Sequence, residues 1–270
     1  FSPETYINTS TSGYYYACID LDNDNDTDII VPSWGTDTLY WQENLGNGIF
    51  GPKQVITTQI DHPKGISVGD LTNNGSYDIA VGGYNDNRIY IYHSKGLNLY
   101  ELKQILSYSN TEPICVFSDD LNEDGLNDVL VASRDDNTIG WYKNLGNQKF
   151  SFQNIINDAV NGALYVYSKD LDNDGFSDVL SSGTQSGLIW QKNLGNDTFG
   201  LAQLIHPTFF GKSICIRDFN GDSLQDVIAS FPDLSPPGTD ILWFENQGNG
   251  NFSNGNLVIN TNAVKSIDSD

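Results

Sequence analysis

One Asp-rich segment recurs along the 270-residue chain at an almost constant interval. The copies read DLDNDNDTD, DLTNNGSYD, DLNEDGLND, DLDNDGFSD and DFNGDSLQD, followed by a shortened DSD at the end of the sequence. Repeats of this length each fold as one supersecondary unit, and neighbouring units stack to share a core. The segments are 50, 50, 50, 48 and 50 residues apart, and they begin at Asp20, Asp70, Asp120, Asp170, Asp218 and Asp268.

A second motif keeps the same interval and adds an aromatic pair and a tight turn to each unit. It reads WQENLGNGIF from Trp41, WYKNLGNQKF from Trp141, WQKNLGNDTF from Trp190 and WFENQGNGNF from Trp243. The second unit carries only a weaker version, IYHSKGLNLY from Ile91. Because the Trp recurs at the same place in each unit, we expect it to pack between units.

Each unit divides into four short apolar runs bounded by turn residues. The first run precedes the Asp segment, as in ICVF at 114–117, and the second follows it, as in DVLV at 128–131. The third run carries the Trp, and the fourth follows the Phe that ends the second motif. Helical periodicity is absent. We therefore predict an all-β fold, a β-propeller of four-stranded blades with about 50 residues in each blade.

The two ends of the sequence match parts of a unit. Residues 1–8 (FSPETYIN) resemble a fourth strand, and residues 263–270 resemble a first strand and the start of an Asp segment. This predicts a single propeller domain over 1–270, with five full blades and a partial blade at each end, taken from a six- or seven-bladed parent. Incomplete terminal blades would allow strand exchange between chains, so self-assembly stays an open alternative.

The Asp segments offer oxygen ligands at alternate positions. Calcium takes about six to eight oxygens from flexible loops, and alternate side chains of a curled loop can point inward. We predict structural calcium sites with ligands at loop positions 1, 3, 5, 7 and 9, where the chemically variable position 7 would use its backbone carbonyl. The predicted ligands are Asp20, Asp22, Asp24, Asp26, Asp28, Asp120, Asn122, Asp124, Leu126, Asp128, Asp170, Asp172, Asp174, Phe176, Asp178, Asp218, Asn220, Asp222, Leu224 and Asp226.

These segments have two other interpretations, an EF-hand and a set of solvated acidic turns. An EF-hand needs a Glu at loop position 12 and flanking helices, whereas this chain has Val31, Val131, Ser181 or Ala229 there and a strand follows. Acidic turns on a solvated face would explain one segment but not several in register. The second segment keeps only two carboxylates, so we expect weak or absent binding there and four Ca²⁺ ions in total, five at most. Its residues are Asp70, Thr72, Asn74, Ser76 and Asp78.

The combined pattern, D-x-D-x-D-G-x-x-D before a strand and then W-x-x-N-x-G-N-x-x-F, resembles the FG-GAP repeat, also called VCBS-like. The resemblance covers essentially the whole chain. It implies calcium-binding propeller blades like those of integrin α-subunits, some lectins and secreted bacterial surface proteins. It also implies a secreted protein, outside the cell or at its surface. Because this fold hosts several activities, function has to be argued from the site.

Acidic side chains outnumber basic ones by 35 to 13, which gives a formal charge of −22. This charge disfavours nucleic acid and anionic membrane surfaces as partners, because both are polyanions. No apolar run approaches the roughly 18 residues that a transmembrane segment needs. Loop positions 1, 3, 5 and 9 hold 18 of the 35 acidic residues, so the excess charge belongs mainly to the predicted metal loops.

We expect a ligand on the side opposite the Asp segments. The connections between second and third strands and between blades emerge together there, and one of them is a Pro-rich insert at 231–239. A sugar site needs an aromatic ring for stacking and polar side chains that form directional hydrogen bonds. The candidate ligand-binding residues are Trp34, His62, Tyr84, Arg88, Arg134 and His206.

These features predict an extracellular, calcium-stabilised binding or adhesion module that is not an enzyme. Its partner would be a glycan or the surface of an extracellular protein. One alternative is a polysaccharide lyase, which needs Arg or Lys with His or Tyr to abstract a proton beside a uronate. The spacing of such residues in the sequence does not tie them together. The other alternative is a purely structural component of a filament.

Overall fold

The computed structural model describes residues 15–96, 99–106, 111–207, 213–234 and 237–261, except for the side chains at 232–239 and 259–261. Within these ranges every regular element is a β-strand, and the strands form five four-stranded antiparallel sheets. The prediction of an all-β fold built from four-stranded propeller blades is confirmed. The same residues include no helix that is long and apolar enough to cross a membrane.

Each blade pairs four consecutive strands in chain order. Blade 1 contains β1 (Ala17–Ile19), β2 (Asp28–Ser33), β3 (Thr38–Gln42) and β4 (Gln54–Thr57). Blade 2 contains β5 (Pro63–Gly69), β6 (Asp78–Gly83), β7 (Arg88–Ser94) and β8 (Tyr100–Leu106). Blade 3 contains β9 (Pro113–Asp119), β10 (Asp128–Ser133), β11 (Thr138–Tyr142) and β12 (Asn154–Asn157). Blade 4 contains β13 (Ala163–Lys169), β14 (Asp178–Gly183), β15 (Gly187–Gln191) and β16 (Gln203–His206). Blade 5 contains β17 (Ile214–Arg217), β18 (Asp226–Leu234), β19 (Pro237–Phe244) and β20 (Asn256–Thr261).

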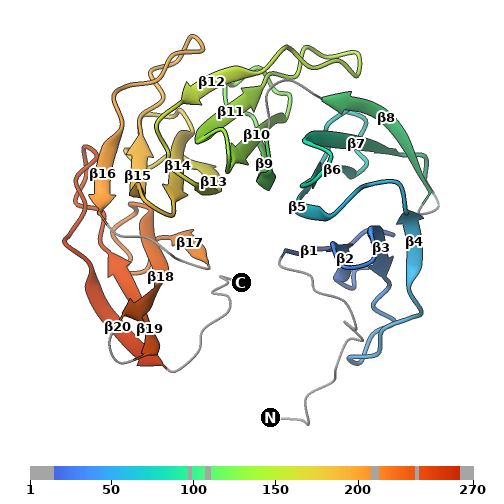
Figure 1. Cartoon of the computed structure of the whole chain (residues 1–270), viewed down its shortest axis with the longest axis horizontal. Helices are drawn as coiled ribbons and strands as arrows, with labels where there is room; N and C mark the ends of the chain where they lie inside the picture. The colour runs from blue at the N-terminus through green and yellow to red at the C-terminus, as the bar shows by residue number, and fades with distance from the viewer. Residues whose placement is uncertain (1–14, 97–98, 107–110, 208–212, 235–236, 262–270) are drawn as a thin grey trace.

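The five blades follow one another around an open arc (Figure 1). In each blade the first strand lies nearest the centre of the arc, and the fourth strand lies at its outer edge (Figure 1). The inner strand β9 contacts the inner strands β5 and β13 of both neighbouring blades. The predicted partial blades, at residues 1–14 and 262–270, lie outside the described residues.

The second and third strands form the buried centre of each blade. All six residues of β10 are buried, and its Leu130 pairs with Trp141 of β11. Outer strands such as β12 expose half of their residues. A strand that is covered on both faces is apolar along its length. This is why the second strand of each unit stands out in the sequence as a continuous run.

Two Trp residues of the second motif, Trp141 and Trp190, pack between blades, as their recurrence predicted. Trp141 of blade 3 contacts Phe199 of blade 4 edge-on, with ring centroids 6.0 Å apart. Trp190 of blade 4 meets Phe252 of blade 5 in the same way at 6.5 Å. Both indoles are 2% exposed. The Phe that ends the motif therefore completes the core of the preceding blade.

The Asn of the second motif ties neighbouring blades together at the Asp segments. Asn193 of blade 4 donates from Nδ2 to the carbonyl of Leu121 in blade 3 at 2.7 Å, and to that of Ser177 in its own blade at 3.0 Å. Asn144 and Asn246 bond in the same way to blades 2 and 4. The sequence motif thus contains an inter-blade connector that we did not predict.

The Pro-rich stretch 231–239 lengthens a hairpin instead of forming the expected loop insert. The strands β18 and β19 stay paired from Phe231 with Asp240 to Leu234 with Pro237. Proline is tolerated in a strand where its missing N–H does not interrupt the ladder. The prolines therefore misled the prediction of strand length at this place.

Candidate functional site

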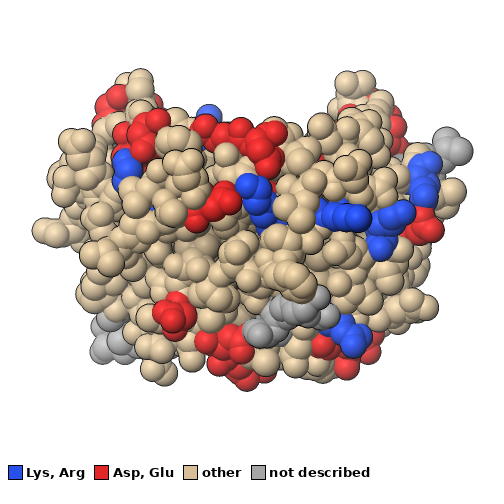
Figure 2. Space-filling view, turned by 90° about the horizontal axis from the view of Figure 1, so that it is seen from above, with Lys and Arg blue, Asp and Glu red and all other residues tan. Residues whose placement is uncertain are grey.

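The antiparallel order of each blade sends its connections to two opposite ends. The Asp segments lie at one end, which we call the loop rim, and the turns between second and third strands lie at the other, the turn rim. Figure 2 shows Asp and Glu gathered mainly along the two rims, with most Lys and Arg between them. We number the Asp segments loop 1 (20–28), loop 2 (70–78), loop 3 (120–128), loop 4 (170–178) and loop 5 (218–226).

The Asp at position 1 shapes each loop. In loop 3, Asp120 accepts backbone N–H bonds from Asp124 at 3.0 Å and from Gly125 at 2.7 Å. The equivalent bonds occur in the other four loops. Gly125 and Gly175 have φ angles of 83° and 97°, in the left-handed region that glycine adopts without strain. The loops therefore curl around their first carboxylate.

The Asp at position 9 is fully buried in every loop. Asp128 accepts the backbone N–H of Asn144 through Oδ1 at 2.7 Å, whereas its Oδ2 completes no hydrogen bond although Trp141 lies beside it. Burial raises the pKa of Asp128 to about 7 and that of Asp178 to about 6. A buried carboxylate oxygen without a donor is costly unless a cation or a proton compensates it.

Position 3 leaves a further oxygen uncompensated in loops 1 and 4. The Oδ1 atoms of Asp22 and Asp172 are buried and have no hydrogen-bond partner. In each of these loops, carboxylate oxygens from positions 1, 3 and 9 lie within 4.8 Å of one another. Calcium prefers such hard oxygen ligands and would supply the missing compensation. The residues of loops 1 and 4 therefore fit a calcium ion.

Loops 3 and 5 carry Asn at position 3. The Nδ2 of Asn122 is buried without a hydrogen-bond partner, and the oxygen and nitrogen of an amide exchange places by a flip. In loop 5, Asn220 donates to the carboxylate of Asp222 at 2.9 Å. An Asn oxygen is a calcium ligand without charge. These loops therefore fit calcium with one carboxylate fewer than loops 1 and 4.

The side chain at position 7 is engaged elsewhere in its blade. It lies against the Gly of the second motif, so only its backbone is left to serve the loop. The backbone ligand at this position stays a prediction. A Cβ on that Gly would lie within 3.1–3.9 Å of the position-7 side chain in the pairs Leu126 with Gly146, Phe176 with Gly195, and Leu224 with Gly248.

Loop 2 satisfies its buried carboxylate from within the chain. Thr72 donates its hydroxyl to Asp78 Oδ2 at 2.9 Å, and the backbone N–H of Leu71 donates to the same oxygen at 3.1 Å. The other oxygen of Asp78 accepts the backbone N–H of Ser94 at 2.9 Å. The N–H bond from position 2 recurs in loops 1, 4 and 5, so the hydroxyl of Thr72 is the donor that sets loop 2 apart and reduces its need for a cation. Weak or absent calcium binding at loop 2 stays a prediction.

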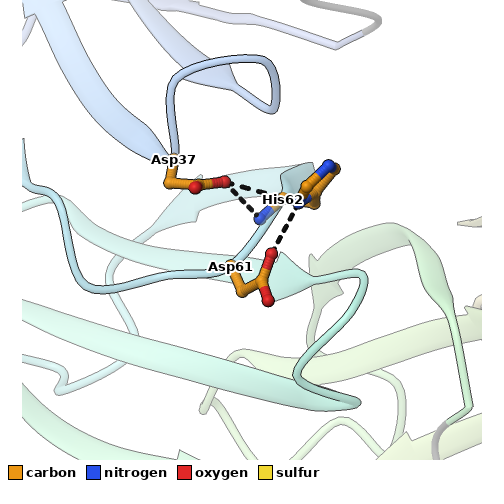
Figure 3. Close-up of side chains that lie close together, drawn as sticks. All are labelled: Asp37, Asp61 and His62. Atoms are coloured by element: carbon orange, nitrogen blue, oxygen red, sulfur yellow. Dashed lines mark hydrogen bonds and ion pairs between the residues drawn. The ribbon is translucent and has the colours of Figure 1, made fainter.

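On the turn rim, His62 connects blades 1 and 2. Its backbone N–H donates to Asp37 Oδ1 at 2.9 Å, and its Nδ1 lies 2.5 Å from Asp61 Oδ1. Figure 3 shows both carboxylates close to His62. The imidazole ring packs against the indole of Trp34, with ring centroids 5.6 Å apart. The hydrogen bond from His62 lowers the pKa of Asp61.

Three further side chains extend this patch across blades 2 and 3. The Nζ of Lys64 lies 3.3 Å from the centroid of the Tyr84 ring, and Arg134 Nη1 lies 3.4 Å from Tyr84 Oη. Arg134 also pairs with Glu112 at 3.8 Å. Burial lowers the pKa of Lys64 and raises that of Tyr84. The turn-rim cluster is defined as Trp34, His62, Lys64, Tyr84 and Arg134.

Two of the six predicted ligand residues lie elsewhere. Arg88 stands beside Tyr90 at the start of β7. His206 packs against Phe231 and Phe244, with ring centroids 4.7 and 5.6 Å apart. The other four, Trp34, His62, Tyr84 and Arg134, meet in the turn-rim cluster.

Sequence reasoning missed the acceptors beside this cluster. Asp37 holds the backbone of His62, and Asn87 holds that of Glu112 at 3.0 Å in the same way. Asn137 does this for Gly162 at 2.7 Å. The three acceptors recur 50 residues apart, and this interval was a signal that could have revealed them.

Comparison with protein families gives a repeated match. A family model described as FG-GAP-like repeat matches residues 20–81, 120–181 and 170–229. These segments contain all five loops. None of the curated proteins matches the sequence.

Solved structures share the fold at low identity. An Agrocybe aegerita lectin that recognises non-reducing terminal N-acetylglucosamine is 21% identical with a TM-score of 0.64, over 92% of this chain and 66% of that one. The V. cholerae biofilm matrix protein Bap1 is 16% identical with a TM-score of 0.52, over 92% of this chain and 38% of that one. AofleA from Arthrobotrys oligospora is 12% identical with a TM-score of 0.60, over 90% and 72% of the two chains. The chain spans less than two thirds of the length of the first two proteins, and the likeness establishes the fold.

Proposed function

Because the chain belongs to the FG-GAP-like repeat family, we propose that it is an extracellular, calcium-stabilised propeller whose turn-rim cluster binds a glycan. One observation carries this proposal. Four residues that the sequence suggested separately, Trp34, His62, Tyr84 and Arg134, lie in one patch across three blades. The patch is on the rim opposite the Asp loops.

The turn-rim cluster offers both kinds of contact that a sugar needs. The half-buried ring of Trp34 provides an apolar surface for stacking, and Arg134 and Lys64 provide donors. The carboxylates of Asp37, Asp61 and Glu112 provide acceptors beside them. Rings with flanking polar groups fix both the face and the orientation of a sugar. The recognition of N-acetylglucosamine by the Agrocybe aegerita lectin supports a glycan as the ligand class.

Calcium is proposed to hold the blades that carry this cluster. Extracellular calcium modules bind at about 10⁻⁴–10⁻³ M, which suits a compartment rich in calcium. At tenfold saturation each occupied loop adds about 1.4 kcal/mol to stability. The Asn connectors join loops 2, 3 and 4 to the next blade, so ions bound in loops 3 and 4 would stiffen these junctions. The location outside the cell rests on this calcium chemistry.

We propose binding rather than catalysis at the turn-rim cluster. A lyase base has to accept a proton near neutral pH, but burial raises the pKa of Tyr84, so its phenolate is less accessible than in free tyrosine. The cluster nevertheless gathers the residue types of a lyase, so the test below includes that activity.

A glycan array probed with and without EDTA tests the proposal. We expect binding to a restricted group of glycans, with a weaker signal in EDTA because the blades lose their calcium. No binding across a broad array, with a protein partner captured instead, would overturn the glycan assignment. Ultraviolet-absorbing unsaturated uronate released from a polysaccharide would show that the chain is a lyase.

The variant Trp34→Ala is expected to weaken glycan binding by about tenfold or more, because loss of a stacking ring removes roughly 1.4 kcal/mol. Calorimetric titration with the best glycan of the array measures the dissociation constant. Arg88→Gln is the matched control, since Arg88 is exposed near the same rim but stands beside Tyr90. Equal affinity in wild type and Trp34→Ala would show that the ligand binds elsewhere.

A further inference from the structure

The residue two positions after the start of the second motif differs in charge from blade to blade. In four blades it directly follows the third strand, whereas in blade 2 it lies within β7. In blades 1, 4 and 5 it lies beside the Asp loop of its own blade. This residue lies outside the D-x-D-x-D pattern, so a count of the aspartates in each loop does not include its charge. The five residues are Glu43, His93, Lys143, Lys192 and Glu245.

In blade 4, this position places an ammonium group among the predicted calcium ligands. Lys192 Nζ bonds to Asp172 and lies 2.7 Å from Asp174 Oδ2. The side chain of Asp172 is 7% exposed, and its Oδ1 has no hydrogen-bond partner. A lysine ammonium group is charged at neutral pH. Loop 4 therefore already contains a cation that belongs to the chain.

In blade 1, the same position adds an anion instead. Carboxylate oxygens of Asp22, Asp24 and Glu43 lie within 4.8 Å of one another. In blade 5, Glu245 accepts a bond from Asn220 of loop 5 at 3.3 Å. Loops 1 and 5 thus gain a carboxylate at the place where loop 4 receives an ammonium group.

Blade 3 provides an internal comparison. Lys143 occupies the same position as Lys192, but its Nζ pairs with Asp197 of blade 4 at 3.3 Å. The two lysines therefore share a sequence position and a charge. They differ in whether the ammonium group lies on a carboxylate of their own Asp loop.

We propose that this position sets the order in which the loops take calcium, with Glu43 making loop 1 the tightest site and Lys192 making loop 4 the weakest of the four. The proposal rests on the calcium binding proposed above and goes beyond it. By the carboxylates at positions 1, 3, 5 and 9 alone, loops 1 and 4 would be equal, since each has four aspartates there. Calcium entering loop 4 has to displace Lys192 from Asp172 and Asp174.

The expected effect is large because the ion carries two charges. Ligand charge tunes the affinity of calcium loops over several decades. A unit charge about 4 Å from a divalent ion contributes enough, even in a water-like dielectric, to change affinity by about tenfold or more. Loops 1 and 4 differ at this position by two charge units. Their dissociation constants should therefore differ by at least about a hundredfold.

The test is calcium titration of the full chain by calorimetry, in wild type, Lys192→Gln, Glu43→Gln and Lys143→Gln. Lys192→Gln is expected to tighten the weakest site by about tenfold. Glu43→Gln should weaken the tightest site by a similar factor. Lys143→Gln, the matched control, should change every constant less than about twofold because this ammonium group pairs outside its own loop. The double variant Lys192→Gln with Asp172→Asn should lose the tightened site, which assigns it to loop 4.

Two results would overturn the proposal. One is unchanged calcium constants in Lys192→Gln. The other is an equal increase in calcium affinity in Lys192→Gln and Lys143→Gln. The effect would then come from the net charge of the chain and not from the contact of Lys192 with loop 4. If wild type and all variants bind no calcium, the proposed calcium sites fail together with this inference. The chain is titrated with calcium in the absence of any glycan, so a failed glycan array does not affect the result.

Discussion

Replacing Gly250 with Ala is expected to lower the free energy of unfolding by about 4 kcal/mol. Gly250 has a φ of 75°, and a Cβ there would overlap the indole of Trp190 in the neighbouring blade. The ring is 2% exposed, and its Nε1 donates to Asp178 Oδ2 at 3.0 Å. It therefore has no room to move, and the new methyl group has to separate the two blades.

The control for this prediction is Gly48→Ala in blade 1. Gly48 occupies the same position of the second motif with a φ of 74°, but no atom lies within 4 Å of its added Cβ. Only the left-handed backbone is strained there, at a cost of about 1 kcal/mol. Urea unfolding at saturating calcium measures both values. Equal losses in the two variants would mean that Gly250 matters for its backbone and not for the contact between blades.

Asn193→Ala is expected to lower the free energy of unfolding by about 3 kcal/mol. Asn193 is 1% exposed, and its side chain bonds to the carbonyls of Leu121 and Ser177 and to the backbone N–H of Gly195. Its removal would leave these buried groups unsatisfied, and one of them belongs to the neighbouring blade. Thermal and urea unfolding both report the loss.

Asn44→Ala is the matched control for Asn193→Ala. Asn44 is half-buried and bonds through its side chain to Thr27 and Gly46 of its own blade. Within the described residues its side chain makes no bond to another blade. We expect a loss of about 1 kcal/mol. A loss as large as that of Asn193→Ala would argue against a special contribution from the bond between blades.

The fold could be predicted from the sequence because each repeat contains residues that mark the positions of its strands. Position 9 of each Asp segment starts the second strand, and in four blades the Trp lies on the third strand, so two landmarks locate the central hairpin of those blades. Apolar runs bounded by Gly and Asn supplied the rest. The extension of β18 and β19 through Pro232 escaped prediction, because proline indicates a turn unless its ladder position is known.

The Asp loops were also accessible from the sequence, whereas their differences were not. The ligand positions follow from spacing, since a tight loop brings positions 1, 3 and 9 together. The contacts of Lys192 with Asp172, and of Lys143 with Asp197, depend on rotamers and on the neighbouring blade. A pattern within one repeat contains no information about such contacts.

The sequence predicted that a ligand binds on the turn rim, but it did not predict which residues come together there. Trp34, Tyr84 and Arg134 lie 50 residues apart and so occupy equivalent turns in successive blades. Their meeting could have been inferred from that interval once the blades are placed side by side. Arg88 and His206 have the right chemistry but lie on strands whose packing directs them elsewhere.

The central claim is that the Asp loops are calcium sites that differ in strength. Calcium titration of the metal-stripped chain by calorimetry, with the number of bound ions as readout, tests it most directly. We predict four ions at saturation, with loop 2 silent because it keeps only two carboxylates and the Thr72 hydroxyl already donates to Asp78. Binding of no calcium, or of five ions with similar affinities, would contradict the account.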